Sequence, residues 1–291
     1  MNIIVTGATG FIGQHVVRAL IERGHSVTAV ARNETRAKSF GWPDTVRFIA
    51  CDIHDPRLDV GTTLGRADAI IHLAWRGLTN YKALFHFEEL LFADYRFLKA
   101  LVWSGHKHLL VTGTCFEYGM QGGQLDELME TKPANPYGLA KDTLRKFLES
   151  LRADRAFTLQ WARLFYLYGT GQNPKSLLAQ LERALDQGDS EFPMSSGEQL
   201  RDYMPVERAA SDLVRLVEHP ECDGVVNICS GIPISVRSLA EGFIKSRGKE
   251  IRLKLGQYPY PDYEPLAFWG VRTRWKELQT SDESPRLRLP A

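Results

Sequence analysis

Tyr137 and Lys141 are the two residues whose types and spacing best suit proton transfer. They stand four residues apart in a stretch with helical periodicity, 136–152, so both side chains are expected on one face of a helix. A cation beside a phenol stabilises the phenolate and lowers the pKa of the phenol from its usual value of about 10. We therefore expect Tyr137 to exchange a proton with a ligand, and Lys141 to lower its pKa and to hold a cofactor ribose. The same spacing also occurs on ordinary helices, where it is only structural.

A glycine-rich turn, Gly7-Ala-Thr-Gly10-Phe-Ile-Gly13, suits the binding of a dinucleotide. It follows an apolar strand and opens a helix, which is the context that such a turn needs. Glycine permits a tight turn and a close approach of the backbone to a pyrophosphate, while the start of the helix offers N–H donors. The spacing is Gly-x-x-Gly-x-x-Gly rather than Gly-x-Gly-x-x-Gly, and a turn without a ligand is the alternative. The predicted cofactor contacts in this turn are Gly7, Gly10, Phe11, Ile12 and Gly13.

The end of the next strand indicates which dinucleotide binds. An acidic residue there accepts hydrogen bonds from the ribose 2′-hydroxyl of NAD, whereas arginine suits the 2′-phosphate of NADP. The sequence has no acid at this point and carries Arg32. This favours NADP(H), with NAD(H) left open and a solvated Arg32 as the alternative. Asp52 and Ile53 follow the third strand and are predicted to contact the adenine, while Leu73 and Ala74 are predicted to lie beside the nicotinamide ribose.

A parallel sheet is needed to bring these residues together. Apolar, β-rich runs alternate with helical patterns in the first half of the chain, which predicts βαβ units. The expected strands are 3–5, 26–31, 46–50, 69–73, 108–112 and 157–167, and the expected helices begin at residue 11 and cover 85–103 and 136–152. We predict an α/β fold, in which a Rossmann-type doubly wound parallel sheet is joined to a smaller C-terminal α/β substrate lobe.

The domain boundaries follow from where this alternation loosens. We expect the dinucleotide-binding domain at residues 1–165, with the chain returning to it around 201–229. Residues 166–280 should form mainly the substrate-binding lobe. The segment 281–291 combines charge, Ser and Pro with little periodicity, which is typical of a disordered tail.

The composition points to a small ligand. There are 36 basic and 35 acidic side chains, for a formal net charge of +1, so neither a nucleic acid nor a membrane partner is expected. No apolar stretch approaches the roughly 18 residues that cross a bilayer, and the first strand begins almost at the initiator, so we expect a cytoplasmic protein. The four cysteines lack paired spacing, which predicts reduced thiols and no metal site.

The sequence resembles the extended short-chain dehydrogenases/reductases, in the group of nucleotide-sugar epimerases, dehydratases and reductases. The resemblance extends from residue 7 to about residue 269, and it rests on several motifs that occur in the family's order. These motifs are Gly7-Ala-Thr-Gly-Phe-Ile-Gly13, Ile71-His-Leu-Ala74, Val111-Thr-Gly-Thr-Cys-Phe-Glu-Tyr-Gly119, Asn135-Pro-Tyr-Gly-Leu-Ala-Lys141, Arg163 to Gly169, Arg201-Asp-Tyr-Met-Pro-Val206 and Val226-Asn-Ile-Cys-Ser-Gly231.

The resemblance assigns further roles. It places Thr114 at the position of the family's catalytic Ser/Thr, where a hydroxyl donates to the substrate carbonyl and shares a proton with Tyr137. A strand-end threonine bonded to the backbone is the alternative. The resemblance also implies that Arg201 grips the substrate's pyrophosphate, that Asp202 is structural, and that the helices 85–103 and 136–152 pair in a homodimer.

Departures from the family pattern narrow the reaction. The dehydratases carry an Asp-Glu pair after the catalytic Thr, and this chain has Cys115 and Phe116 there, which argues against elimination. The C3/C5 epimerizing enzymes use a cysteine where this chain has Phe116, so we interpret Cys115 as a packed small side chain. Tyr166 replaces the family's usual asparagine, and it either stacks on the ligand or fills core space. Trp75 is predicted to line the sugar pocket.

The resulting hypothesis is an NADPH-dependent reductase. Its substrate would be a nucleotide-linked 4-keto-6-deoxyhexose and its product the 6-deoxy sugar nucleotide, with Trp75, Thr114, Tyr166 and Arg201 as substrate-binding residues. Three alternatives stay open: a nucleotide-sugar 4-epimerase with retained NAD, a non-catalytic NADP-sensing protein, and a reductase of a small ketone without a nucleotide.

Overall fold

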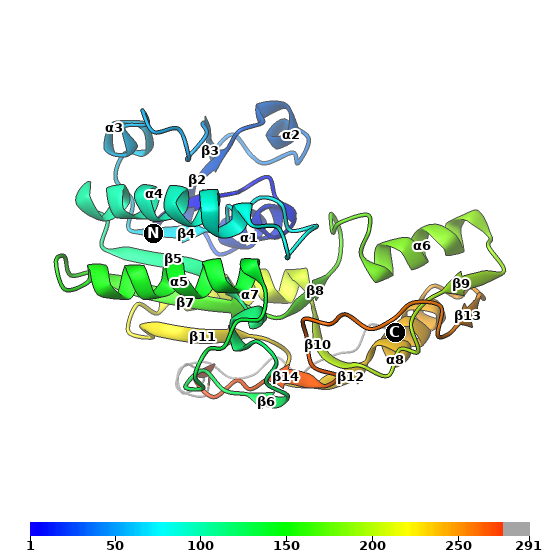
Figure 1. The fold of residues 1–291 in the computed structure, drawn as a ribbon. Helices are drawn as coiled ribbons and strands as arrows, with labels where there is room; N and C mark the ends of the chain where they lie inside the picture. Colours follow the sequence, from blue (N-terminus) through cyan, green and yellow to red (C-terminus); the bar gives the residue numbers. More distant parts are fainter. Residues whose placement is uncertain (276–291) are drawn as a thin grey trace.

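The computed structural model describes residues 1–275, and a seven-stranded parallel sheet forms its centre (Figure 1). The strand order is β11-β7-β5-β4-β1-β2-β3. The bounds of these strands are β1 Asn2–Thr6, β2 Ser26–Ala31, β3 Arg47–Ala50, β4 Ala69–His72, β5 His108–Thr114, β7 Thr158–Leu164 and β11 Gly224–Ile228. The order reverses between β1 and β4, which is the doubly wound pattern and confirms the predicted Rossmann-type sheet.

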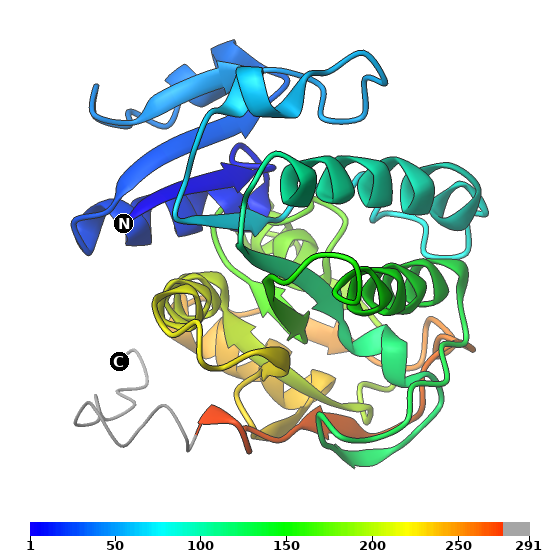
Figure 2. The same cartoon turned by 90° about the vertical axis from the view of Figure 1, so that its left-hand side faces the viewer.

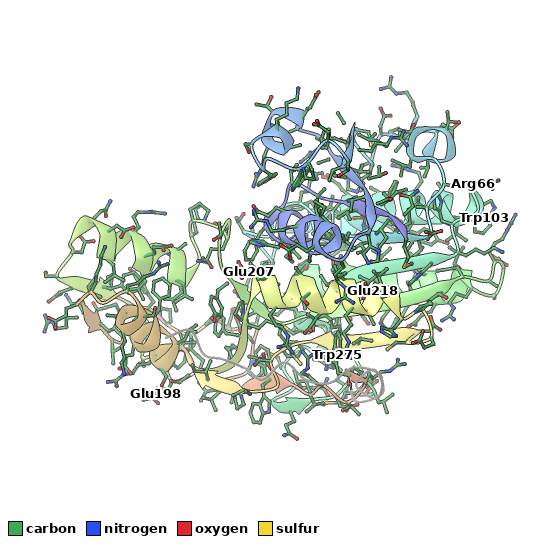
Figure 3. The ribbon with its side chains drawn as sticks, turned by 180° about the vertical axis from the view of Figure 1, so that it is seen from behind. Arg66, Trp103, Glu198, Glu207, Glu218 and Trp275 are labelled. Carbon is green, nitrogen blue, oxygen red and sulfur yellow. The ribbon has the colours of Figure 1, made fainter. Side chains whose placement is uncertain are left out.

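Helices cover both faces of this sheet. They are α1 Phe11–Glu22, α2 Glu34–Lys38, α3 Val60–Leu64, α4 Leu91–Trp103, α5 Pro136–Leu151 and α7 Val206–Glu218, together with a π-helical turn, η1 His86–Leu90, and a 3-10 turn, η2 Cys115–Tyr118. Figure 2 shows α4 and α5 side by side on one face. Figure 3 shows the other face, where α7 carries Glu207 and Glu218 at its two ends and packs on α1.

The sequence alternation of β1 explains the two hydrophobic cores. Ile3 and Val5 point into the core under α1 and α7, whereas Ile4 points into the core under α4 and α5. A strand covered on both faces is apolar at every position, because successive side chains point to opposite sides.

A second, smaller lobe extends to the right of the sheet in Figure 1. It contains α6 Leu177–Gln187, α8 Val236–Ser246, the strands β8 Tyr166–Tyr168, β10 Leu200–Pro205 and β12 Pro233–Ser235 of one sheet, and the pair β9 Glu191–Pro193 and β13 Arg252–Lys254. The remaining pair, β6 Gly123–Leu125 with β14 Phe268–Gly270, links an insertion of the first domain to the end of the described chain. The chain leaves the large sheet after β7 and returns to it as β11.

Several elements differ from the sequence prediction. The expected strand 157–167 is divided at Phe165 into β7 and β8, which belong to different sheets. The expected helix 85–103 starts as the π turn η1 before α4 begins. The helices α6 and α7 are not among the helices expected from the sequence. The prediction for residues 281–291 lies outside the described residues, and no helix within residues 1–275 is long and apolar enough to span a membrane.

Candidate active site

A cleft of about 270 Å³ opens where β1, β2, β3 and β4 end at the point of strand-order reversal. In doubly wound sheets this is where nucleotides bind. The predicted residues that line the cleft are Gly7, Gly10, Arg32, Asp52, Ile53, Leu73, Ala74 and Trp75. The fold therefore brings together residues from four separate strand ends, as predicted.

The glycine turn forms the floor of this cleft. Gly7 has a φ of +68°, and a Cβ there would lie 2.8 Å from the Ala74 backbone nitrogen. A Cβ on Gly13 would lie 2.2 Å from the Gly7 carbonyl oxygen, so this glycine is required by the packing of α1 on β1. Gly10 is the N-cap of α1, and no side chain of the described residues caps that helix start. Open first-turn N–H groups beside glycine backbone fit the pyrophosphate of a dinucleotide.

Two guanidinium groups stand at the adenosine end of the cleft. Arg32 and Arg36 are both exposed and both line it, and Arg36 was not predicted. Asn33 caps α2 by accepting a hydrogen bond from the Arg36 N–H at 2.8 Å, which places Arg36 on the first turn of that helix. Asp52 lies across the cleft, and its carboxylate accepts a hydrogen bond from the His54 N–H at 3.0 Å.

Tyr137 stands at the start of α5 in an aromatic enclosure, with only 7% of its surface exposed. Tyr81 stacks on its ring with the centroids 5.5 Å apart, and Phe116 approaches it edge-on at 6.3 Å. The ring of His86 lies at 5.3 Å. The start of α5 is fixed by Asn135, whose side chain accepts from the Gly138 N–H at 2.8 Å.

Burial sets the acidity of this phenol. It raises the pKa of Tyr137 above the ordinary value, the nearby Tyr81 and Glu117 add to the rise, and a hydrogen bond with the Thr114 side chain opposes it. The prediction that Lys141 lowers this pKa is therefore wrong for the protein without ligand. The penalty for burying a phenolate is the largest contribution to this rise.

Lys141 lies one turn further along α5 and is 2% exposed. Its ammonium nitrogen is 4.2 Å from the ring centroid of Trp75. Burial lowers the pKa of Lys141 to about 8, while the charges of Asp94 and Glu117 act in the opposite direction. Lys141 is thus a buried amine that changes its protonation state just above neutral pH.

Thr114 ends β5 and is held by a buried carboxylate. Its backbone N–H donates to Glu117 Oε1 at 2.8 Å, and its hydroxyl accepts from the Phe116 N–H at 3.3 Å. Glu117 is also bound by Trp161 Nε1 at 3.0 Å and by Arg163 Nε at 2.6 Å. The alternative in which Thr114 bonds to the backbone is met in part, since its hydroxyl accepts from the Phe116 N–H and also forms a hydrogen bond with Tyr137.

The predicted substrate residues of the second lobe meet at one carboxylate. Glu264 accepts a hydrogen bond from the Tyr166 hydroxyl at 2.5 Å and one from Arg201 Nε at 2.8 Å. Arg201 also donates from Nη1 to the carbonyl of Leu266 at 2.9 Å, and its guanidinium lies 4.5 Å from the ring centroid of Phe268. The guanidinium of Arg201, which was expected to bind a substrate pyrophosphate, is therefore already paired with the carboxylate of Glu264.

Phe116 connects the two halves of the site. Its ring centroid is 6.3 Å from that of Tyr137 and also 6.3 Å from that of Tyr166. Cys115 is packed in an apolar cluster beside it, as expected of a small core side chain. Asp202, expected to be structural, accepts the backbone N–H groups of Ser230 at 2.6 Å and Gly231 at 2.9 Å.

Some predicted residues lie apart from the cleft lining. Phe11, Ile12 and Gly13 belong to α1 and are not among the residues that line the cleft, and Tyr137 and Lys141 lie beyond its Trp75 edge. The lining residues that had not been predicted are Thr9, Val30, Ala31, Asn33, Arg36, Cys51 and His54. The one usable signal was the position of Arg36 just after the end of the second strand, four residues beyond Arg32.

No cluster of three or more His, Cys, Asp or Glu side chains that could hold a metal ion occurs in the part of the chain that the structure describes.

A buried Tyr and Lys pair on one helix, beside a glycine turn at the reversal point of a parallel sheet, defines an enzyme of the extended short-chain dehydrogenase/reductase type. Residues 3–229 match the NAD dependent epimerase/dehydratase family, and this chain belongs to that family.

Known proteins of this family resemble the chain over nearly its whole length. A dTDP-6-deoxy-L-talose 4-dehydrogenase (NAD(+)) of Aggregatibacter actinomycetemcomitans is 30% identical over 275 residues, which is 94% of this chain and 100% of the relative. A UDP-glucose 4-epimerase of Halalkalibacterium halodurans is 27% identical, covering 83% of this chain and 79% of the relative. The structure of MoeE5 in complex with UDP-glucuronic acid and NAD superposes with a TM-score of 0.77 at 25% identity, covering 96% of this chain and 93% of that one.

Proposed function

We propose that this protein reduces the 4-keto group of a nucleotide-linked 4-keto-6-deoxyhexose with NADPH. The observation that carries the proposal is the convergence of Thr114, Tyr137 and Lys141 beyond the nicotinamide end of the cleft. These three side chains come from β5 and α5, so the sheet and one helix fix their relative positions. A hydroxyl pair with an adjacent amine suits transfer of a proton to a carbonyl oxygen.

The reaction adds one hydride and one proton across the carbonyl. Bound NADPH supplies the hydride, which brings two electrons to the carbonyl carbon and leaves NADP⁺. Thr114 donates a hydrogen bond to the carbonyl oxygen, and Tyr137 gives that oxygen its proton. The raised pKa of Tyr137 supports this direction, because it keeps the phenol protonated as a reductase needs it. The Lys141 ammonium stabilises the phenolate that remains.

The two arginines at the adenosine end support NADP(H). Arg32 and Arg36 present guanidinium groups to one mouth of the cleft, where a 2′-phosphate would lie. The relative from Aggregatibacter is named for NAD(+), so this preference is the part of the proposal that most needs measurement.

The choice of substrate has two supports. The relative with 30% identity is named as a 4-dehydrogenase of a dTDP-linked 6-deoxyhexose, and a 4-dehydrogenase running in reverse is a 4-ketoreductase. In addition, the rings of Phe116 and Tyr81 pack on Tyr137 and the ring of Tyr263 packs on both of them, so the walls beside the reacting group are mainly aromatic. Apolar walls suit the methyl group of a 6-deoxy sugar better than a hydroxymethyl or a carboxylate.

The deciding experiment mixes purified protein with NADPH or NADH and a panel of 4-keto-6-deoxy sugar nucleotides, and follows loss of the reduced cofactor by absorbance. We expect consumption of NADPH with at least one nucleotide base, and loss of this activity in Tyr137→Phe. The absence of consumption, together with NAD recovered from the denatured protein, would favour a nucleotide-sugar 4-epimerase. Binding of NADPH without any turnover would favour a non-catalytic sensing protein. Turnover of simple ketones alone would favour a reductase whose substrate carries no nucleotide.

A further inference from the structure

The Lys141 ammonium lies between two indole rings. Its nitrogen is 4.2 Å from the ring centroid of Trp75 and 5.8 Å from that of Trp161. Both distances fall within the range over which the face of an indole attracts a cation, and this attraction strengthens where water is excluded. Trp161 lies on β7, is completely buried and donates its indole N–H to Glu117. The position of this ring is therefore fixed.

Trp75 is fixed differently, by an imidazole in the turn η1. Its Nε1–H donates to Nδ1 of His86 at 3.1 Å, and the two rings lie nearly parallel, with an interplanar angle of 17°. On the other side of the imidazole, Nε2 is 2.9 Å from the carbonyl oxygen of Asn80. An indole nitrogen can only donate and a carbonyl can only accept. The imidazole must therefore be neutral, with its hydrogen on Nε2.

His86 is fully buried, so the tautomer is held on both sides without exchange with water. Burial lowers the pKa of His86, the hydrogen bond to Asn80 opposes this, and the charge of Lys141 lowers it further. The chain of contacts thus runs from a backbone carbonyl through His86 and Trp75 to the catalytic amine. Each of the two hydrogen bonds in this chain has one possible direction of donation, and the last link is the contact of the ammonium with the ring face of Trp75.

We propose that Trp75 and His86 are positioning residues that hold the ammonium of Lys141 beside Tyr137. This inference rests on the proposed function for the role of Lys141, but the contact itself can be tested without any substrate. The groups that face Lys141 from the neighbouring elements are His72 of β4, Asp94 of α4, Glu117 of η2 and His86 of η1. Of these influences, burial lowers the pKa of Lys141, and the charges of Asp94 and Glu117 raise it.

The first measurement is the ¹H–¹⁵N spectrum of the tryptophan indoles, of which the sequence has six. Trp75→Phe removes one indole signal and so identifies that of Trp75. We expect His86→Phe, which keeps a ring but loses the acceptor, to move the Trp75 signal upfield, and His86→Gln to restore part of the shift. An unmoved Trp75 signal in His86→Phe would refute the proposal while leaving the proposed function intact.

The second measurement is the affinity for NADPH as a function of pH. Trp75→Leu removes the aromatic face, so the pH above which affinity falls should decrease by about half a unit. Trp75→Phe should lower this pH by less, because phenylalanine keeps an aromatic face but lacks the indole N–H that donates to His86. Trp103→Phe is the matched control, since Trp103 also carries a cation contact, 5.2 Å from Lys99 Nζ, but lies 43% exposed at the end of α4.

Turnover, where a substrate is found, gives the third readout. His86→Phe, which leaves the side chain of Trp75 in place, should lower kcat about tenfold or more while the KM for the sugar nucleotide changes little, as expected for loss of alignment at the reacting group. Equal losses in kcat and in substrate affinity would show that Trp75 and His86 only fill space. An unchanged pH dependence of NADPH affinity in Trp75→Leu would show the same.

Discussion

Arg201 and Glu264 form a buried ion pair in which the guanidinium Nε lies 2.8 Å from the carboxylate, with 4% and 8% of the two side chains exposed. They are 63 residues apart, on β10 and on the segment that precedes β14. A pyrophosphate that approaches Arg201 therefore meets a site whose positive charge is already balanced. Glu264, in turn, already accepts hydrogen bonds from Arg201 and from the Tyr166 hydroxyl.

Removal of one partner should cost more than removal of both. Arg201→Met leaves a buried carboxylate without its cation, and we expect the free energy of unfolding to fall by about 3–5 kcal/mol. The double variant Arg201→Met, Glu264→Met should recover most of this loss in chemical denaturation. Both variants should bind nucleoside diphosphates more weakly. Retained binding in Arg201→Met would show that Arg201 does not hold the pyrophosphate.

The glycine turn offers a contrast between two alanine substitutions. Gly13→Ala would place a Cβ 2.2 Å from the Gly7 carbonyl oxygen, so we expect lower stability and a loss of dinucleotide affinity of tenfold or more. Gly242, in α8, has open space around its Cβ position, and Gly242→Ala should leave binding unchanged and raise stability by up to about 1 kcal/mol. Fluorescence titration and thermal melts measure both effects. Normal NADPH affinity in Gly13→Ala would contradict the assigned role of the turn.

Cofactor preference should depend on the two arginines of the cleft. Replacement of either Arg32 or Arg36 by Ala should weaken NADPH binding about 10- to 100-fold, because each guanidinium to phosphate hydrogen bond contributes roughly 1.5–3 kcal/mol. The affinity for NADH should stay within about twofold. Arg57→Ala serves as the control, since Arg57 is an exposed arginine paired with Asp55. A similar loss for both cofactors, or tighter binding of NADH by the unchanged protein, would mean that NAD(H) is the natural ligand.

Lys141 predicts opposite pH effects on binding and on stability. Its pKa is lowered to about 8 from 10.5, so the folded chain loses this proton before the unfolded chain does. Between these two pH values the unfolded state binds more protons, and this group therefore makes stability rise with pH. Cofactor affinity should fall over the same window, because the ammonium is lost. Lys141→Arg should remove the fall, which isothermal titration at several pH values measures.

The outer faces of α4 and α5 predict a homodimer. Phe92 on α4 is 57% exposed and Leu139 on α5 is 45% exposed, and these two helices lie together on one side of the molecule. We expect a dimer in sedimentation, and a monomer for Phe92→Glu combined with Leu139→Glu. Leu128→Glu is the control, since Leu128 is 93% exposed in a loop. If the protein without substitutions sediments as a monomer, this prediction is wrong.

Local sequence patterns were sufficient for the sheet and for the residues that follow its strands. The strand 26–31 and the helix beginning at Phe11 were predicted with the observed boundaries, because apolar periodicity and the glycine turn are short-range signals. In contrast, α7 was not predicted as a helix, although its apolar residues recur at helical spacing. Pro205 stands at its N-cap without a side-chain capping bond, so the usual start signal is missing.

The contacts that refine the site could not be predicted in this way. Tyr166 and Glu264 are 98 residues apart in sequence, and Glu117 and Arg163 are 46 residues apart. Neither pair has a spacing that suggests contact, because only the tertiary fold brings them together. The raised pKa of Tyr137 was missed for a related reason, since burial by Tyr81 and Phe116 depends on a distant loop and a neighbouring turn.

The return of the chain to the large sheet limits where this protein can be divided. Strand β11 pairs along its full length with β7, from Gly224 beside Gln160 to Ile228 beside Leu164, and α7 supplies much of the apolar cover of α1. A gene fragment that ends near residue 165 would lack both. A chain divided near residue 165 therefore separates two neighbouring strands of one sheet, so the two parts are expected to fold only when they are together.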